Sequence, residues 1–159
     1  MFKHTLRAFA LLALTAAAAQ AQTATQTVTF AVNAVNQIAF TGTPSLTITT
    51  AVAGSAPTSV TDATSSWAVT TNQTGAKITA SIPTVMPTGL TLSANLVAPT
   101  GATSAGYQAL STTGVDLVTV ITKLAQGSLG VTYKLDATAA AGVVASATRL
   151  VTYTITGGT

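Results

Sequence analysis

Apolar and polar residues alternate strictly along two stretches near the C-terminal end of the chain, residues 129–136 and 150–156. Val151, Tyr153 and Ile155 fall on one face of the second stretch, and threonines occupy much of the other. Alternation with a period of two, built from β-branched and aromatic residues, is typical of a half-buried antiparallel strand. The first stretch has the same character, its apolar face comprising Leu129, Val131, Tyr133 and Leu135.

The same alternation recurs along most of the remaining chain. The predicted strands cover residues 27–35, 45–50, 67–71, 78–82, 90–96 and 115–122; residues 38–40 are a short continuation of the first, and 107–111 is an additional short candidate. The segment 115–122 is apolar on both sides, so a single helical turn is an alternative there. Eight or nine short strands with turn signals between them predict an all-β fold, a single Ig-like antiparallel β-sandwich.

Two connections are predicted from small and turn-forming residues. Residues 51–65 are rich in Ala, Ser, Thr, Gly and Pro and predict a long surface loop. Residues 72–75, Asn-Gln-Thr-Gly, predict a hairpin turn between the strands at 67–71 and 78–82. Asn72-Gln73-Thr74 also fits a glycosylation sequon, but the turn interpretation requires no modifying enzyme.

The first 21 residues have the pattern of a Sec-type signal peptide. Lys3 and Arg7 precede an apolar run that ends in Ala19-Gln20-Ala21, a small-x-small cleavage site. The run is short for a stable membrane anchor, and a buried N-terminal helix is the alternative. We therefore expect export, cleavage after Ala21, and a single β-sandwich domain over residues 22–159 without a membrane span. The expected location is extracellular, cell-surface or periplasmic.

The composition after residue 21 excludes several classes of function. This part has no Cys, Glu or His, and it carries four basic and three acidic residues. Without a basic patch, nucleic-acid binding is not expected. Without disulfides, the domain must rely on its core and its backbone hydrogen bonds. The abundance of threonine also fits a disordered or O-glycosylated stalk, but the regular alternation favours a folded sheet.

Catalytic, cofactor and metal sites have few candidate residues. Nucleophilic triads and zinc sites usually need His, Cys or Glu, which are absent here. Asp62 is predicted in a loop, Asp116 at a strand start and Asp136 near a strand end. These carboxylates do not form the cluster that calcium requires, although distant residues can meet in a fold. We therefore assign no catalytic, cofactor-binding or metal-binding residue, and we expect neither enzyme activity nor metal dependence.

Trp67 is the only tryptophan and has two interpretations. It could stack on sugar rings in a carbohydrate-binding module, or it could pack between two sheets. Val69 and Thr71 share its face, which favours the core. Tyr133 and Tyr153 are in phase with Val131 and Val151, so they are also predicted to be core residues. The aromatic residues are scattered through the chain, which suits a core better than a binding strip.

The C-terminal stretch resembles a known group of proteins. The Ala-Gly-rich loop at residues 139–144, followed by Val-Thr-Tyr-Thr-Ile-Thr, is similar to the closing hairpin of bacterial Ig-like and fimbrial-type extracellular domains. The resemblance implies a cell-surface, adhesive or fibre component. We therefore expect a non-enzymatic secreted structural protein; a secreted module binding carbohydrate or another ligand is the alternative.

The predicted strands at the two ends of the domain, 27–35 and 150–156, could pair with another molecule. Neither 27–35 nor 150–156 contains an internal proline, and only Arg149 borders one of them with charge, although soluble proteins usually protect exposed strand edges by such means. Either both strands pair inside the domain, or an edge is open to another copy or another surface protein. Only residues 22–26 precede the first predicted strand, so the sequence predicts little chain for a separate N-terminal arm.

Overall fold

The computed structural model describes residues 21–159, so the expected signal peptide lies outside the described residues except for Ala21. Residues 33–159 form one compact unit, and the chain up to Val32 belongs to a separate unit. No helix in the described part of the chain is long and apolar enough to cross a membrane.

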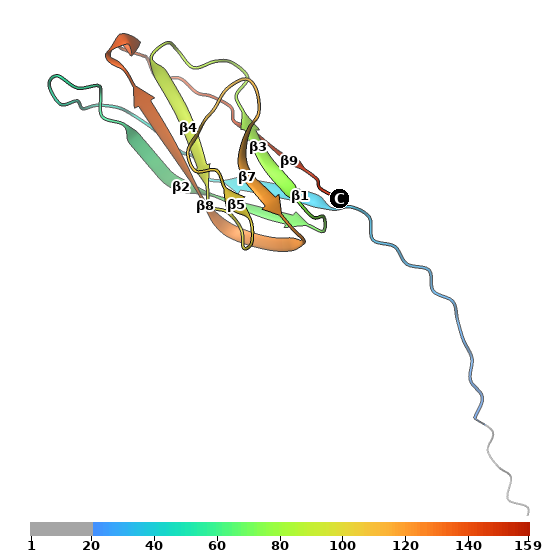
Figure 1. Ribbon diagram of the computed structural model, residues 1–159. Coiled ribbons are helices and arrows are strands. Elements are labelled where there is room, and N and C mark those ends of the chain that lie inside the picture. Colours follow the sequence, from blue (N-terminus) through green and yellow to red (C-terminus); the bar gives the residue numbers. More distant parts are fainter. Residues whose placement is uncertain (1–20) are drawn as a thin grey trace, which may run out of the picture. The chain divides into compact units, whose positions relative to one another are not determined.

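The compact unit is an antiparallel β-sandwich made of two sheets (Figure 1), which confirms the predicted fold class. In spatial order, the first sheet contains β1 (Asn36–Thr41), β2 (Val60–Thr71), β8 (Leu124–Ala137), β4 (Leu90–Leu96) and β6 (Gln108–Ala109). The second contains β5 (Thr103–Ser104), β7 (Val115–Ile121), β3 (Ala76–Ser81) and β9 (Thr152–Thr156). One short 3-10 turn, η1 (Ala139–Ala141), follows β8.

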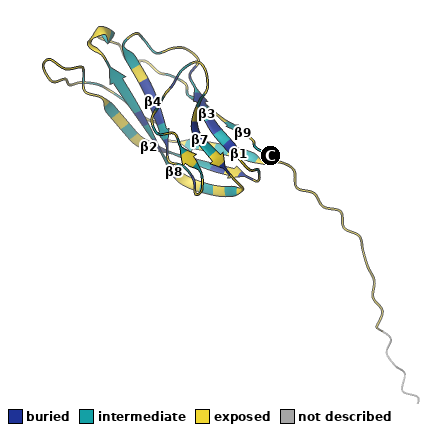
Figure 2. Ribbon diagram, viewed as in Figure 1, coloured by how far each residue is buried: buried dark blue, intermediate teal, exposed yellow. Residues whose placement is uncertain are grey.

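The alternation of the long strands places their apolar faces between the two sheets. Buried and partly exposed residues alternate along β3 and through much of β2 and β8 (Figure 2). Trp67 is 2% exposed and Tyr133 is 8% exposed, which confirms both as core residues. Tyr153 is only partly buried, but it packs against the same core. Burying a large apolar side chain contributes about 1.5–3 kcal/mol, so this core is the main source of stability.

Two predicted hairpins are wrong, because their strands lie in different sheets. Residues 72–75 connect β2 in the first sheet to β3 in the second, and the chain between β8 and β9 also crosses from one sheet to the other. The partners of β2 are β1 and β8, whereas β9 pairs with β3. Alternating strands joined by turn residues are compatible with a hairpin and with a connection between two sheets. The sequence pattern alone therefore could not show which sheet each strand joins. The loop predicted at 51–65 is also too long, since β2 begins at Val60 and includes Asp62.

The first predicted strand, residues 27–35, takes no part in either sheet. Its apolar residues lie in solvent, with Val28 73%, Phe30 89% and Val32 84% exposed (Figure 2). The first strand of the sandwich is instead β1, which covers the short predicted piece at 38–40. The prediction of a short N-terminal arm is therefore wrong, because residues 22–35 all lie outside the sheets.

Candidate functional site: a groove between two unpaired segments

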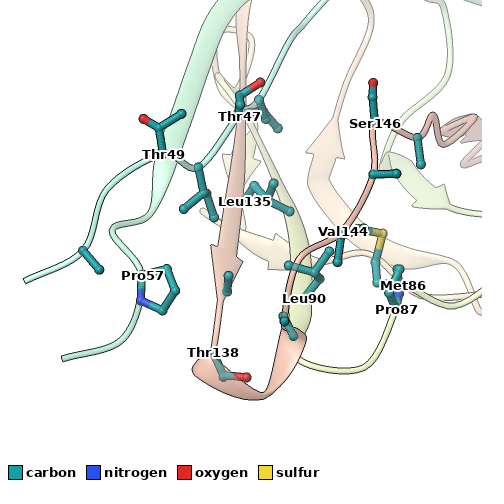
Figure 3. A pocket seen from close by; sticks show the side chains of 18 of the residues that line it. Thr47, Thr49, Pro57, Met86, Pro87, Leu90, Leu135, Thr138, Val144 and Ser146 are labelled. Atoms are coloured by element: carbon teal, nitrogen blue, oxygen red, sulfur yellow. The ribbon is translucent and has the colours of Figure 1, made fainter. Parts of the chain in front are cut away.

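A groove of about 560 Å³ lies at one end of the sandwich. Two non-strand segments line it, the first wall (residues 46–50) and the second wall (residues 144–149). Leu135 and Leu90 lie between them (Figure 3), and Met86 also contributes to the lining. Leu90 and Leu135 come from β4 and β8, so the floor continues the apolar interior of the first sheet.

The first wall alternates like a strand but has no ladder partner. Leu46 and Ile48 are partly buried, whereas Thr47 and Thr49 are exposed. Thr50 accepts a hydrogen bond from the Thr58 amide, and no other backbone–backbone hydrogen bond within residues 21–159 involves this wall. Buried backbone groups are almost always paired, so an apolar-faced strand with unpaired backbone is an unfinished sheet edge.

Asp62 fixes the start of the first wall to β2. Its carboxylate accepts hydrogen bonds from the Ser45 amide at 2.9 Å, the Thr64 amide at 2.8 Å and the Thr64 hydroxyl at 2.6 Å. These donors, the Ser45 amide foremost, lower the pKa of Asp62, because they stabilise the ionised carboxylate. The side chain therefore positions a wall of the groove, a role that sequence reasoning missed when it placed Asp62 in a loop.

Gly42 turns the chain from β1 toward the first wall. Its φ of +109° is strained for a residue with a side chain, and an added Cβ would lie 2.7 Å from the Cα of Ser65. Glycine is therefore required at this position for two reasons: its positive φ angle and its close approach to β2.

The second wall leads into β9 and is also unpaired. Within the described chain, no backbone–backbone hydrogen bond outside the strands involves residues 143–150. The wall contributes small residues and Val144, together with the partly buried Arg149. The guanidinium of Arg149 donates from Nη1 to the Thr148 carbonyl, while its buried Nε has no partner among the described residues. Both sides of the groove thus carry hydrogen-bonding groups that lack protein partners.

A pair of tyrosines joins the two sheets. The hydroxyls of Tyr133 on β8 and Tyr153 on β9 are 2.5 Å apart, and the ring of Phe40 stacks on Tyr153 with the centroids separated by 3.8 Å. Burial is the main cause that raises the pKa of both phenols. Tyr133 precedes Leu135 by two residues on the same face of β8, so the floor of the groove begins where this aromatic cluster ends.

At the opposite end of the sandwich, Asn72 holds the base of the N-terminal segment. Its Oδ1 accepts from the Val35 amide at 2.8 Å, and its Nδ2 donates to the Asn33 carbonyl at 2.7 Å. The Asn72 amide also donates to the Val35 carbonyl. Asn72, the asparagine of the possible sequon, therefore uses both polar atoms of its side chain to hold residues 33–35, which directly follow residues 21–32.

The other two aspartates are occupied by local contacts. Asp116 pairs with Lys77 at 2.9 Å. Asp136 pairs with Lys134 at 3.0 Å and also accepts from the Ser59 hydroxyl. The hydrogen bond from Ser59 is the main cause that lowers the pKa of Asp136. The structure does not bring the three carboxylates into one site, and residues 21–159 contain no group of three or more His, Cys, Asp or Glu able to hold a metal ion.

The groove therefore suits apolar and backbone contacts rather than acid–base chemistry. No aromatic side chain lines it, and Arg149 is its only charged residue. Sequence reasoning did not find it, although the alternation of Leu46 and Ile48 was the available signal. Comparison of the chain with family models, with curated proteins and with solved structures finds no significant match.

Proposed function

We propose that the protein is a non-enzymatic structural subunit of an extracellular or cell-surface fibre, exported through its signal peptide and assembled by strand pairing between copies. The observation that carries this proposal is the segment 27–35, which alternates like a core strand but lies outside both sheets with its apolar residues exposed. Exposed apolar patches and unpaired strands mark interaction surfaces in soluble proteins.

The surface chemistry agrees with such a role. Residues 22–159 contain seven charged side chains, and the segment 22–35 contains none. Contacts between copies would therefore depend on apolar side chains and backbone hydrogen bonds, which strand addition provides without charged pairs.

A binding module is the second candidate, and the groove is the observation in its favour. Its volume lies within the range of small-molecule sites, and its lining combines apolar side chains with polar groups. A carbohydrate is the less suitable ligand for this groove, because sugar recognition uses exposed aromatic rings and no aromatic side chain lines it.

The state of assembly separates the two candidates. We expect the mature protein, beginning at Gln22, to form oligomers of increasing mass with concentration in size-exclusion chromatography with light scattering. Negative-stain microscopy of the same samples should show filaments. A strict monomer at millimolar concentration, with no filaments on the native cell, would overturn the fibre proposal and favour the binding module.

A further inference from the structure

We propose that the groove binds a single-chain amphiphile with a compact anionic headgroup, such as a fatty carboxylate, and that the guanidinium of Arg149 pairs with this headgroup. The hydrocarbon chain of the ligand lies on the apolar floor between the two walls. This site goes beyond the proposed fibre function and does not depend on it. It also gives a ligand class to the groove on which the binding-module candidate rests.

Arg149 lines the groove with a guanidinium whose hydrogen-bonding capacity is mostly unused. A guanidinium has five N–H donors and remains charged at all ordinary pH values. Among residues 21–159, the structure gives it one hydrogen bond, from Nη1 to the carbonyl of Thr148, its neighbour in the chain. Its Nε is buried and has no partner there. Because buried donors are almost always paired, an acceptor supplied by a ligand would complete the bonding of this side chain.

The charge of Arg149 has no counter-charge in the groove. Neither ion pair of the described chain includes Arg149. Asp136 lies between the lining residues Leu135 and Ala137 on β8, but it is on the opposite face of the strand and pairs with Lys134. The lining therefore contains one cation and no anion. A partly buried cation is stabilised by an anion that also supplies hydrogen-bond acceptors.

The rest of the lining suits a hydrocarbon chain. Leu90 and Leu135 form the floor, and Val144 adds an apolar side chain on the second wall (Figure 3). The partly buried Leu46 and Ile48 do the same on the first wall. No aromatic side chain lines the groove, so it offers no stacking surface for a ring. A flexible chain of methylene groups can follow this aliphatic surface, and its burial drives binding.

A carboxylate is the headgroup that best matches Arg149. Its two oxygens can accept two parallel N–H bonds from the planar guanidinium. The same charge also occurs on the anionic lipids of a bilayer. We assign the free amphiphile, because membrane surfaces are recognised by clusters of basic residues and Arg149 is the only cation that lines the groove.

Two variants of the mature chain with the same net charge test the headgroup contact. Arg149→Gln removes the guanidinium, while Lys123→Gln removes a charge from an exposed side chain outside the groove. We expect Arg149→Gln to weaken the binding of decanoate by about tenfold or more, because hydrogen bonds to a charged group are lost. Lys123→Gln should bind like the wild type. Arg149→Lys restores the charge without the two parallel donors, so it should recover only part of the affinity.

Two adjacent valines provide a matched pair that tests the place of the hydrocarbon chain. Val144 lines the groove, whereas Val143 is fully exposed and lies outside it. Val144→Asp puts a negative charge into the lining and should weaken the binding of decanoate by about tenfold. Val143→Asp has the same net charge and should leave binding unchanged. Both positions lie outside the strands, so each variant should keep the melting temperature of the wild type.

Titration calorimetry with decanoate below its micelle concentration measures these affinities. Decanol and decyltrimethylammonium carry the same chain with an uncharged and a cationic headgroup, and acetate carries the headgroup alone. We expect saturable binding of decanoate at one molecule per chain, and binding of the other three that is weaker by about tenfold or more. In nitrogen-edited NMR spectra, the Nε–H resonance of Arg149 should shift, and its proton should exchange more slowly, when decanoate binds.

The possible results separate this site from its alternatives. If wild-type protein does not bind decanoate, or if Arg149→Gln binds it as tightly as Lys123→Gln does, the site is refuted. Binding to vesicles of phosphatidylglycerol without binding to decanoate would assign the contact to a membrane surface and would also overturn the proposal. Light scattering of the same samples reports assembly, so the fibre proposal stands or fails separately from the ligand.

Discussion

Residues 28–32 and residues 151–155 carry nearly the same pattern, Val-Thr-Phe-Ala-Val and Val-Thr-Tyr-Thr-Ile. The second forms most of β9, from Thr152 onward, which pairs with β3, and its Tyr153 packs against the core. The first remains outside both sheets with its phenylalanine in solvent. Alternation therefore specifies that a segment is able to pair as a strand, but it does not specify which partner it finds, or whether that partner belongs to the same molecule.

The largest difference between the two segments should appear when their central aromatic residues are removed. Tyr153→Ala deletes the ring that stacks on Phe40 and the hydroxyl bonded to Tyr133, and it should lower the free energy of unfolding by about 3 kcal/mol. Phe30→Ala should change it by less than about 0.5 kcal/mol, because the ring is already in solvent. Denaturant unfolding of dilute monomer measures both; equal losses would contradict the different placement of the two segments.

Gly42→Ala should have the next largest effect on stability, because it disturbs the connection from β1 to the first wall. The alanine must adopt a φ near +109° and place its Cβ against the backbone of Ser65, at a cost of about 1–3 kcal/mol. Gly101→Ala is the matched control, since that glycine also has a positive φ but no atom near the position of a Cβ. The melting temperature of Gly42→Ala should be lower than that of Gly101→Ala. The reverse order would show that the close approach of Gly42 to Ser65 does not determine the cost of the substitution.

The tyrosine pair should make the domain sensitive to alkali. Both phenols have folded-state pKa values raised above 10, so their contribution to stability is complete below pH 10 and is lost as the pH rises further. Tyr133→Phe should reduce this loss above pH 10, while costing about 1 kcal/mol at neutral pH through the missing hydrogen bond. Unfolding free energies measured from pH 8 to 11.5 test both statements; an identical pH dependence in the variant would contradict the assignment.

The smallest expected effect on stability is that of Asp62→Ala, which should nevertheless release the first wall. The pKa of Asp62 is lowered in the folded protein, so its hold on the Ser45 amide is present above about pH 4 and is lost as the pH falls through the folded-state pKa. Amide hydrogen exchange at Ser45 and Thr64 should accelerate in the variant with little change in the melting temperature. Protection that persists in Asp62→Ala would show that another contact fixes this wall.

Most of the sandwich could be predicted from the sequence, because its long strands bury every second residue. The strand predicted at 90–96 matches β4, and Trp67 and Tyr133 lie in the core as their spacing indicated. Sheet membership could not be predicted. Residues 72–75 look like a hairpin turn whether the next strand pairs with β2 or crosses to the other sheet, and only the complete set of pairings decides between them.

The groove could not be predicted, because it depends on pairings that the structure lacks. The sequence correctly indicated that Leu46 and Ile48 face inward, but nothing in the alternation of 45–50 signals that the segment has no ladder partner. The same reasoning treated residues 27–35 as a paired strand.

Hydrogen exchange at backbone amides tests the proposed assembly through this unpaired segment most directly, because each ladder bond protects an amide. We would compare assembled wild-type protein with dilute monomer. The account predicts slower exchange in the assembled protein for residues 27–32, which have no strand partner in the monomer. Assembled protein in which these residues exchange as fast as in the monomer would contradict it.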